Sequence, residues 1–247
     1  MLTILKLLFN YWKRSYSWVY SFILPLLLMM IFQTFTPAST LLPNLLISSA
    51  LSNGVFGLAI VYSELRNSVI MKKIRATPLP QWKVVGGIIS FNVFISLLAN
   101  CWIFGVGAFF YRSDINFGQI NWFYLLLGVF LATLLGSLLG FLIGSVAPNL
   151  QAAGNFAFFI NMPSSFLSGI YVPMRQLLKN DKLGLTAKFI PYSYPVNIAN
   201  RAFSHYNLDS VRDNLLFTNY RLPIIFSLLW IFGLFGLALA VYRVRKE

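Results

Sequence analysis

The chain has 247 residues, of which 58% are hydrophobic and 10% are charged, with a formal net charge of +13. An ordinary soluble domain carries about a quarter charged residues, so this composition indicates a membrane protein without a soluble catalytic domain. Because the basic residues flank apolar runs, we expect them to meet anionic lipid headgroups and predict no nucleic-acid partner.

Six apolar runs are long enough to cross roughly 30 Å of hydrocarbon as helices. They predict an all-α membrane protein with one transmembrane domain over residues 1–247. Residues 1–17 mix apolar and basic side chains, which favours a helix lying in the membrane interface. The first run lacks a small-x-small cleavage pattern, so we expect it to be retained. The runs cover residues 18–35, 41–62, 86–111, 122–147, 152–172 and 223–242.

A basic segment broken by prolines, residues 71–83, separates the second run from the third. Pro78 biases Thr77 away from helical angles, and Pro80 blocks immediate resumption of a helix. An even number of spans puts this segment on the same side as both termini, and the basic bias of that side predicts a cytoplasmic location. Its basic residues are Lys6, Lys13, Arg14, Arg66, Lys72, Lys73, Arg75, Lys83, Arg243, Arg245 and Lys246.

The middle of each run carries only neutral polar residues, among them Asn53, Asn92, Asn100, Asn155 and Asn161. Carriers driven by protons or ions usually keep ionisable residues at membrane depth, so this class is disfavoured. The amides fit two interpretations, hydrogen bonds between helices or a polar contact for a substrate, and the sequence leaves both open.

The fourth run contains a stripe of small residues at every fourth position, which places them on one helix face. Another backbone can approach such a face closely, so the stripe predicts a packing surface. We expect it to pack within the subunit, with packing across a dimer as the alternative. Its members are Gly128, Ala132, Gly136, Gly140 and Gly144.

Residues for bond chemistry are sparse. There is no Gly-Lys pair and therefore no phosphate-binding loop, and His205 and Cys101 are the single histidine and cysteine. The six acidic residues are scattered outside the apolar runs. We therefore predict that the chain is not an enzyme and has no catalytic residue, bound cofactor or metal site of its own.

Three segments in order carry a family resemblance. SELRNSVIMKKIRATPLPQWKVVGG, residues 63–87, resembles the loop after the second span of ABC-2 type transporter permeases. GFLIGSVAPNLQAAGNFAFFINMPSSFLSGIYVPMR, residues 140–175, is similar to the family's fourth and fifth spans, and FIPYSYPVNIANRAF, residues 189–203, to its segment before the last span. The chain departs from the family at Asn67 and Ser68, and at residues 177–182.

The resemblance implies a permease half that pairs with a second permease copy or paralogue, and with separate ATPase subunits that bind ATP and Mg. It also implies a bacterial plasma membrane location with both termini cytoplasmic, and short re-entrant helices over residues 185–202. The segment after the second span would couple to the ATPase through Glu64, Arg66, Lys72, Lys73, Arg75, Thr77 and Pro78. The pathway or its external gate would include Asn161, Pro163, Phe166, Ser168, Gly169, Pro173 and Pro195.

The main hypothesis is therefore the membrane subunit of an ATP-driven exporter. The resemblance implies a hydrophobic or amphipathic cargo, such as a drug, an antibiotic, a peptide or a lipid-linked molecule. The alternative from another class is a membrane-embedded sensor or structural partner that transports nothing.

Overall fold

The computed structural model describes residues 9–10, 19–32, 38–76, 80–112, 115, 117–203, 215–217 and 219–244. All regular elements within these ranges are helical, which confirms the all-α class. Short π or 3₁₀ segments are η1 (Val19–Ile23), η2 (Asn53–Leu58), η3 (Phe117–Gln119) and η4 (Arg201–Phe203). The α-helices are α2 (Leu24–Phe32), α3 (Ala38–Ser52), α4 (Ala59–Arg66), α5 (Val69–Ala76), α6 (Gln81–Phe110), α7 (Trp122–Val146), α8 (Leu150–Leu167), α9 (Met174–Leu178), α10 (Asp181–Phe189), α11 (Ser193–Asn200) and α13 (Arg221–Val244).

Four helical stretches in the described residues are long and apolar enough to cross a membrane: Leu41–Arg66, Gln81–Phe110, Trp122–Val146 and Arg221–Val244. The fifth expected span corresponds to α8, whose 18 residues include the polar Asn155 and Asn161. Of the first, the structure describes residues 19–32. The count of six spans thus stays a prediction, and most of the expected interfacial helix, residues 1–17, lies outside the described residues.

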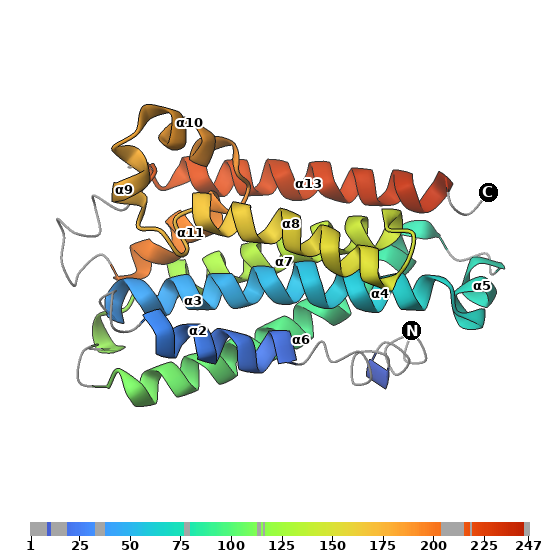
Figure 1. Ribbon diagram of the computed structural model, residues 1–247, viewed down its shortest axis with the longest axis horizontal. Helices are drawn as coiled ribbons and strands as arrows, with labels where there is room; N and C mark the ends of the chain where they lie inside the picture. Colours follow the sequence, from blue (N-terminus) through green and yellow to red (C-terminus); the bar gives the residue numbers. More distant parts are fainter. Residues whose placement is uncertain are drawn as a thin grey trace.

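Helix α7 is the centre of the bundle. It contacts α3, η2, α4, α6, α8, α11 and α13. Figure 1 shows α3 with α4, α7, α8 and α13 running along the long axis, with α5 at one end and α9 and α10 at the other. Because consecutive long helices alternate in direction, the end of α13 at Val244 lies at the same end as α5.

The small residues of α7 allow unusually close helix packing. A Cβ atom added to Gly140 would overlap the carbonyl oxygen of Gly54, and one added to Gly144 would lie 2.7 Å from that of Ala59. Gly136 faces Leu51, and Gly128 faces α11 near Ala199. The stripe, including the buried Ala132, therefore lies against helices of the same subunit.

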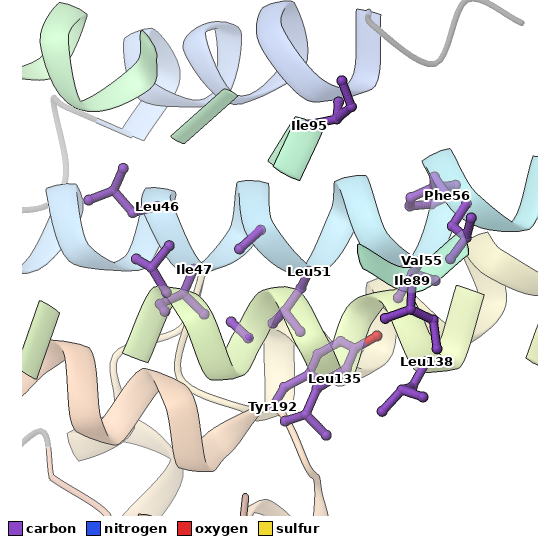
Figure 2. Packing of buried hydrophobic residues seen from close by; sticks show 14 of the residues in the cluster. Leu46, Ile47, Leu51, Val55, Phe56, Ile89, Ile95, Leu135, Leu138 and Tyr192 are labelled. Atoms are coloured by element: carbon purple, nitrogen blue, oxygen red, sulfur yellow. The ribbon is translucent and has the colours of Figure 1, made fainter. Parts of the chain in front are cut away.

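Apolar side chains fill the space around this contact. Figure 2 shows Leu51 and Val55 of the α3–η2 stretch in one cluster with Leu135 and Leu138 of α7 and Ile89 of α6. The six residues of η2 are all buried and form π turns between α3 and α4. This widening of the helix brings Gly54 against α7 at the point of closest approach.

The end opposite α5 is built from short helices. Gly169 has a φ of +90°, a conformation that favours glycine, and it turns the chain after α8 towards α9. The helices α10, α11 and η4 occupy the region where re-entrant helices are expected, and every residue of α11 is buried. Their depth in a membrane stays a prediction.

Large apolar side chains cover the outer faces of α6 and α13. Phe94 and Phe109 of α6 are exposed, as are Leu229 and Phe232 of α13. On a soluble protein a surface of this kind would cause aggregation, whereas lipid tails solvate it in a membrane. The outside of the bundle therefore has the chemistry of a lipid-facing surface.

Candidate coupling end and polar seam

The helical chain is interrupted sharply between α4 and α5, and the side chain of Ser68 stabilises this interruption. The hydroxyl of Ser68 donates to the carbonyl of Leu65 at 2.6 Å and accepts from the backbone N–H of Met71 at 3.2 Å. The second bond is an N-terminal cap, which satisfies an otherwise unpaired donor in the first turn of α5. Ser68 therefore ends α4 and starts α5 within a single turn.

Helix α5 is anchored on one face and open on the other. Met71 is buried and Ile74 packs against the core, whereas Val69 and Lys72 are exposed. An exposed valine beside a lysine leaves a surface with both apolar and basic character at the tip of the molecule. We refer to Val69 and Lys72 as the α5 outer face.

The residues predicted for coupling separate into different environments. Glu64 on α4 is exposed, as is Lys72, and Lys73 and Arg75 belong to α5. Thr77 and Pro78 lie outside the described residues. Arg66 differs from Glu64 and Lys72 because it is buried.

Arg66 holds the end of α7 and the turn that follows it. Its Nη1 donates to the carbonyls of Gly144 at 3.2 Å and Ser145 at 2.6 Å. Its Nη2 donates to the carbonyls of Ala147 at 2.7 Å and Pro148 at 3.4 Å. A guanidinium suits this position because the last carbonyls of a helix lack partners within the helix and carry the negative end of its dipole.

A second group of polar side chains follows one face of α3 at intervals of four residues. Asn44 Nδ2 donates to the carbonyl of Gly169 at 3.2 Å, and Ser48 Oγ lies 2.7 Å from Tyr171 Oη. One turn further, Ser52 Oγ accepts from Asn161 Nδ2 at 3.2 Å. We call this line of contacts between α3 and α8, with the turn that follows α8, the polar seam.

Several acceptors of the seam have no hydrogen-bond partner among the described residues: Asn44 Oδ1, Asn161 Oδ1 and Ser165 Oγ. Burial of an unpaired polar group costs about 1–3 kcal/mol, so these atoms make the seam less stable than an apolar contact of the same size. They are also free to accept a hydrogen bond from water or from another molecule that enters between α3 and α8.

Other amides bond to α6 and α7 rather than to α8. Asn53 Nδ2 donates to Ser96 Oγ of α6 at 2.8 Å, and Asn92 Nδ2 donates to Ser137 Oγ of α7 at 2.8 Å. Asn100 bonds within α6, to the carbonyl of Ser96. The geometry thus gives Asn53 and Asn92 the structural interpretation that the sequence had left open.

The residues predicted for the pathway or gate cluster around the second half of α8. Pro163 and Phe166 are exposed, Ser168 is buried, and the ring of Phe166 lies 5.3 Å from that of Tyr171. Gly169 is the turn described above, and Pro173 precedes α9. Pro195 lies apart from them, buried in α11, with its carbonyl facing Gly128 of α7.

Arg201 ties the end of α11 to the chain that precedes α13. Its Nη2 donates to the carbonyl of Phe217, and the carbonyl of the adjacent Ala202 accepts from Asn121 N at 3.0 Å. Burial lowers the pKa of Arg201, and Tyr124 opposes this effect in part. Because an arginine pKa starts far above neutrality, the guanidinium remains charged and keeps this bond.

Two kinds of residue were missed by sequence reasoning. Ser68 was noted only as a departure from a family pattern, although a serine directly before a helix is a cap signal. Ser48 and Ser52 were overlooked, and their spacing of four from Asn44 was the available signal.

Within the described residues, no group of three or more His, Cys, Asp or Glu side chains lies close enough to hold a metal ion.

The long apolar helices define an integral membrane protein that crosses the bilayer several times. The family of ABC-2 type transporters matches residues 2–203, and the chain therefore belongs to this family, whose members form the membrane part of ABC transporters. No match was found among curated proteins or among solved structures.

Proposed function

We propose that this chain is the permease subunit of a bacterial ATP-driven exporter that moves a hydrophobic or amphipathic compound across the plasma membrane. Family membership supports the permease part of this proposal. The observation that supports a separate ATPase is α5, a short capped helix that is anchored by Met71 and presents the α5 outer face away from the bundle. The direction of transport and the class of cargo rest on the family resemblance.

A separate ATPase subunit, with ATP and Mg bound, would dock on the α5 outer face. Val69 is 67% exposed, and contact with a partner would remove this apolar side chain from water. Glu64 and Lys72 beside it would add charged contacts at the rim. Lys73, Arg75, Thr77 and Pro78 belong to the same proposed contact region.

The polar seam is the part of the bundle best suited to open for cargo. Its hydrogen bonds are neutral, and its unpaired acceptors favour the entry of water or of a polar group when α3 and α8 move apart. Phe166 and Pro163 at the outer end of α8 would contribute to an external gate with Ser168, Gly169 and Pro173. A second permease copy or paralogue would complete the pathway.

Co-purification tests the ATPase partner. The tagged full-length chain, extracted with mild detergent from cells of its own source, should retain a soluble protein that contains a phosphate-binding loop and hydrolyses ATP. Replacing Val69→Asp and Lys72→Glu together should lower the amount retained about tenfold, which corresponds to about 1.4 kcal/mol of binding free energy.

Lys182→Glu is the matched control, because Lys182 is also exposed on a short helix but lies at the opposite end of the molecule. It should leave the retained ATPase unchanged. If the parent chain retains no ATPase in the same extraction, the exporter proposal is wrong and a membrane-embedded sensor or structural protein becomes the better interpretation.

A further inference from the structure

Arg66 stands at a junction of three helices. It is the last residue of α4, and Ser68 begins the cap of α5 only two residues later. Its four carbonyl acceptors extend from the final turn of α7 to Pro148, and Asn149 then caps α8 through its side chain. One buried guanidinium therefore joins the segment that carries α5 to the corner between α7 and α8.

We propose that Arg66 is a positioning residue that locks α5 to the α7–α8 corner, so that displacement of α5 also displaces the first turn of α8. This proposal rests on the proposed function, because it assigns the route by which movement at the α5 outer face reaches the polar seam. Glu64 and Lys72, by contrast, are exposed and reach outwards from the same segment.

The chemistry of the guanidinium favours a contact that fixes the position of the α7–α8 corner relative to α4. A guanidinium has five N–H donors in a rigid planar fork, whereas a lysine ammonium is a point charge on a flexible chain. The acceptors lie on both sides of the helix end, from Gly144 to Pro148, and a fork with two separate nitrogens reaches both sets at once. Loss of either set would remove the hydrogen bonds that join α4 to that side of the corner.

Helix α4 also packs directly against α7 and α8. Ala59 of α4 packs against Gly144, and this backbone contact does not involve the turn that follows α7. Ala147 is buried, whereas residues 148–151 are exposed and add little apolar packing to the corner. Arg66 donates the hydrogen bonds from α4 to Ala147 and Pro148 in the turn itself, so its substitution tests this contact separately from the packing of α4 on α7 and α8.

The lock can be tested on the chain alone in lipid nanodiscs. In a Cys101→Ser background, spin labels are attached to Lys72→Cys and Gln151→Cys, both exposed positions on α5 and α8. The parent should give one narrow distance distribution. Arg66→Ala should lose this narrow peak, and Arg66→Gln and Arg66→Lys should broaden it. A second label pair at the opposite end, Gln119→Cys with Lys182→Cys, should remain unchanged in every variant.

The three substitutions keep the test decisive if one variant fails to fold. A narrow, unshifted α5–α8 distribution in any folded variant overturns the lock, and broadening of both label pairs shows a general loss of structure and also overturns it. These distance measurements require no ATPase, so they test the lock even if the proposed function is wrong.

The transmission step is tested in the complex with its ATPase. Arg66→Lys should leave ATP hydrolysis near the parent rate and lower the amount of cargo moved per ATP about tenfold, within the usual range of coupling between two sites. A merely structural role would lower hydrolysis and transport together. If transport per ATP stays at the parent value while the α5–α8 distribution broadens, Arg66 does not transmit the movement.

Discussion

Neutral hydrogen bonds join helices inside this bundle, and the buried charge of Arg66 lies at its α5 end. Asn53 and Asn92 each donate to a serine on a neighbouring helix at 2.8 Å. In a bilayer, such bonds contribute on average about 0.6 kcal/mol, and at most about 1.7 kcal/mol. They fix how the helices are rotated about their axes while leaving the helices able to separate, which suits a protein whose helices must move.

Substitution of Asn92 is the clearest test of how much one such hydrogen bond contributes to stability. Asn92→Ala removes the bond to Ser137, and Ser137 keeps its own bond to the carbonyl of Thr133 at 2.6 Å. No donor is stranded, so the free energy of unfolding should fall by only about 1 kcal/mol. Denaturant unfolding in detergent micelles measures this change.

Asn155→Ala is the control, because Asn155 is exposed on α8 and its recorded contact with Gln151 is long, at 3.5 Å. Its effect should stay within about 0.5 kcal/mol. Equal losses for the two substitutions would contradict the assignment of Asn92 to helix packing.

The cap of α5 gives a second prediction for a single residue. Ser68→Ala removes the side-chain partner of Met71 N and should destabilise the start of α5 by about 1 kcal/mol. Hydrogen exchange should then become faster at the first amides of α5. Ser90→Ala, at an exposed position on α6, should leave them unchanged. Unchanged exchange in Ser68→Ala would mean that packing of Met71 alone starts the helix.

At the scale of elements, the spacing of residues in the sequence predicts which of them share a helix face, but not which helix that face contacts. The stripe from Gly128 to Gly144 predicts a close-packed face because residues four apart share one side of a helix. Its partners, the α3–η2–α4 stretch and, at Gly128, α11, depend on contacts far apart in the chain. The π turns of η2, where Gly54 meets α7, likewise follow from no pattern that we identified in the sequence.

The same limit applies to the candidate site. A serine before α5 could be identified as a cap from local sequence alone. Arg66 was grouped with the coupling residues by resemblance, and its acceptors, more than 75 residues away along the chain, follow only from tertiary structure. The buried position of Pro195 likewise depends on how α11 packs on Gly128.

Glycine substitutions test the close packing of α7. Gly140→Ala places a methyl group into the backbone of Gly54, which neither helix can avoid without moving. Overpacking of this kind costs about 1–3 kcal/mol, so the thermal midpoint in detergent should fall. Gly233→Ala is the matched control, because nothing lies within 4 Å of the added Cβ atom. It should be neutral or slightly stabilising, since alanine favours a helix more than glycine does. An unchanged thermal midpoint for Gly140→Ala would mean that α7 and η2 lie further apart than in the structure.

At the scale of the whole molecule, the strength of the hydrophobic signal decided what could be predicted. The runs at residues 41–62, 86–111, 122–147 and 223–242 correspond to the four long apolar helices. The run at 152–172 is interrupted by amides and a proline, and its helix ends at Leu167. The all-α membrane class and the family are confirmed, while orientation rests on charge alone.

Orientation can be measured with single cysteines in a Cys101→Ser background. Lys72 and Lys182 are exposed at opposite ends of the bundle, on α5 and α10. The positive-inside rule places α5 in the cytoplasm, so a membrane-impermeant maleimide should label Lys182→Cys in intact cells and Lys72→Cys only after permeabilisation. Phe232→Cys, at an exposed position on the apolar face of α13, should resist labelling in both cases because the thiolate does not form in lipid. Labelling of Lys72→Cys in intact cells would show that α5 lies outside the cell. The α5 outer face could then not contact a cytoplasmic ATPase, and the exporter proposal would lose its basis.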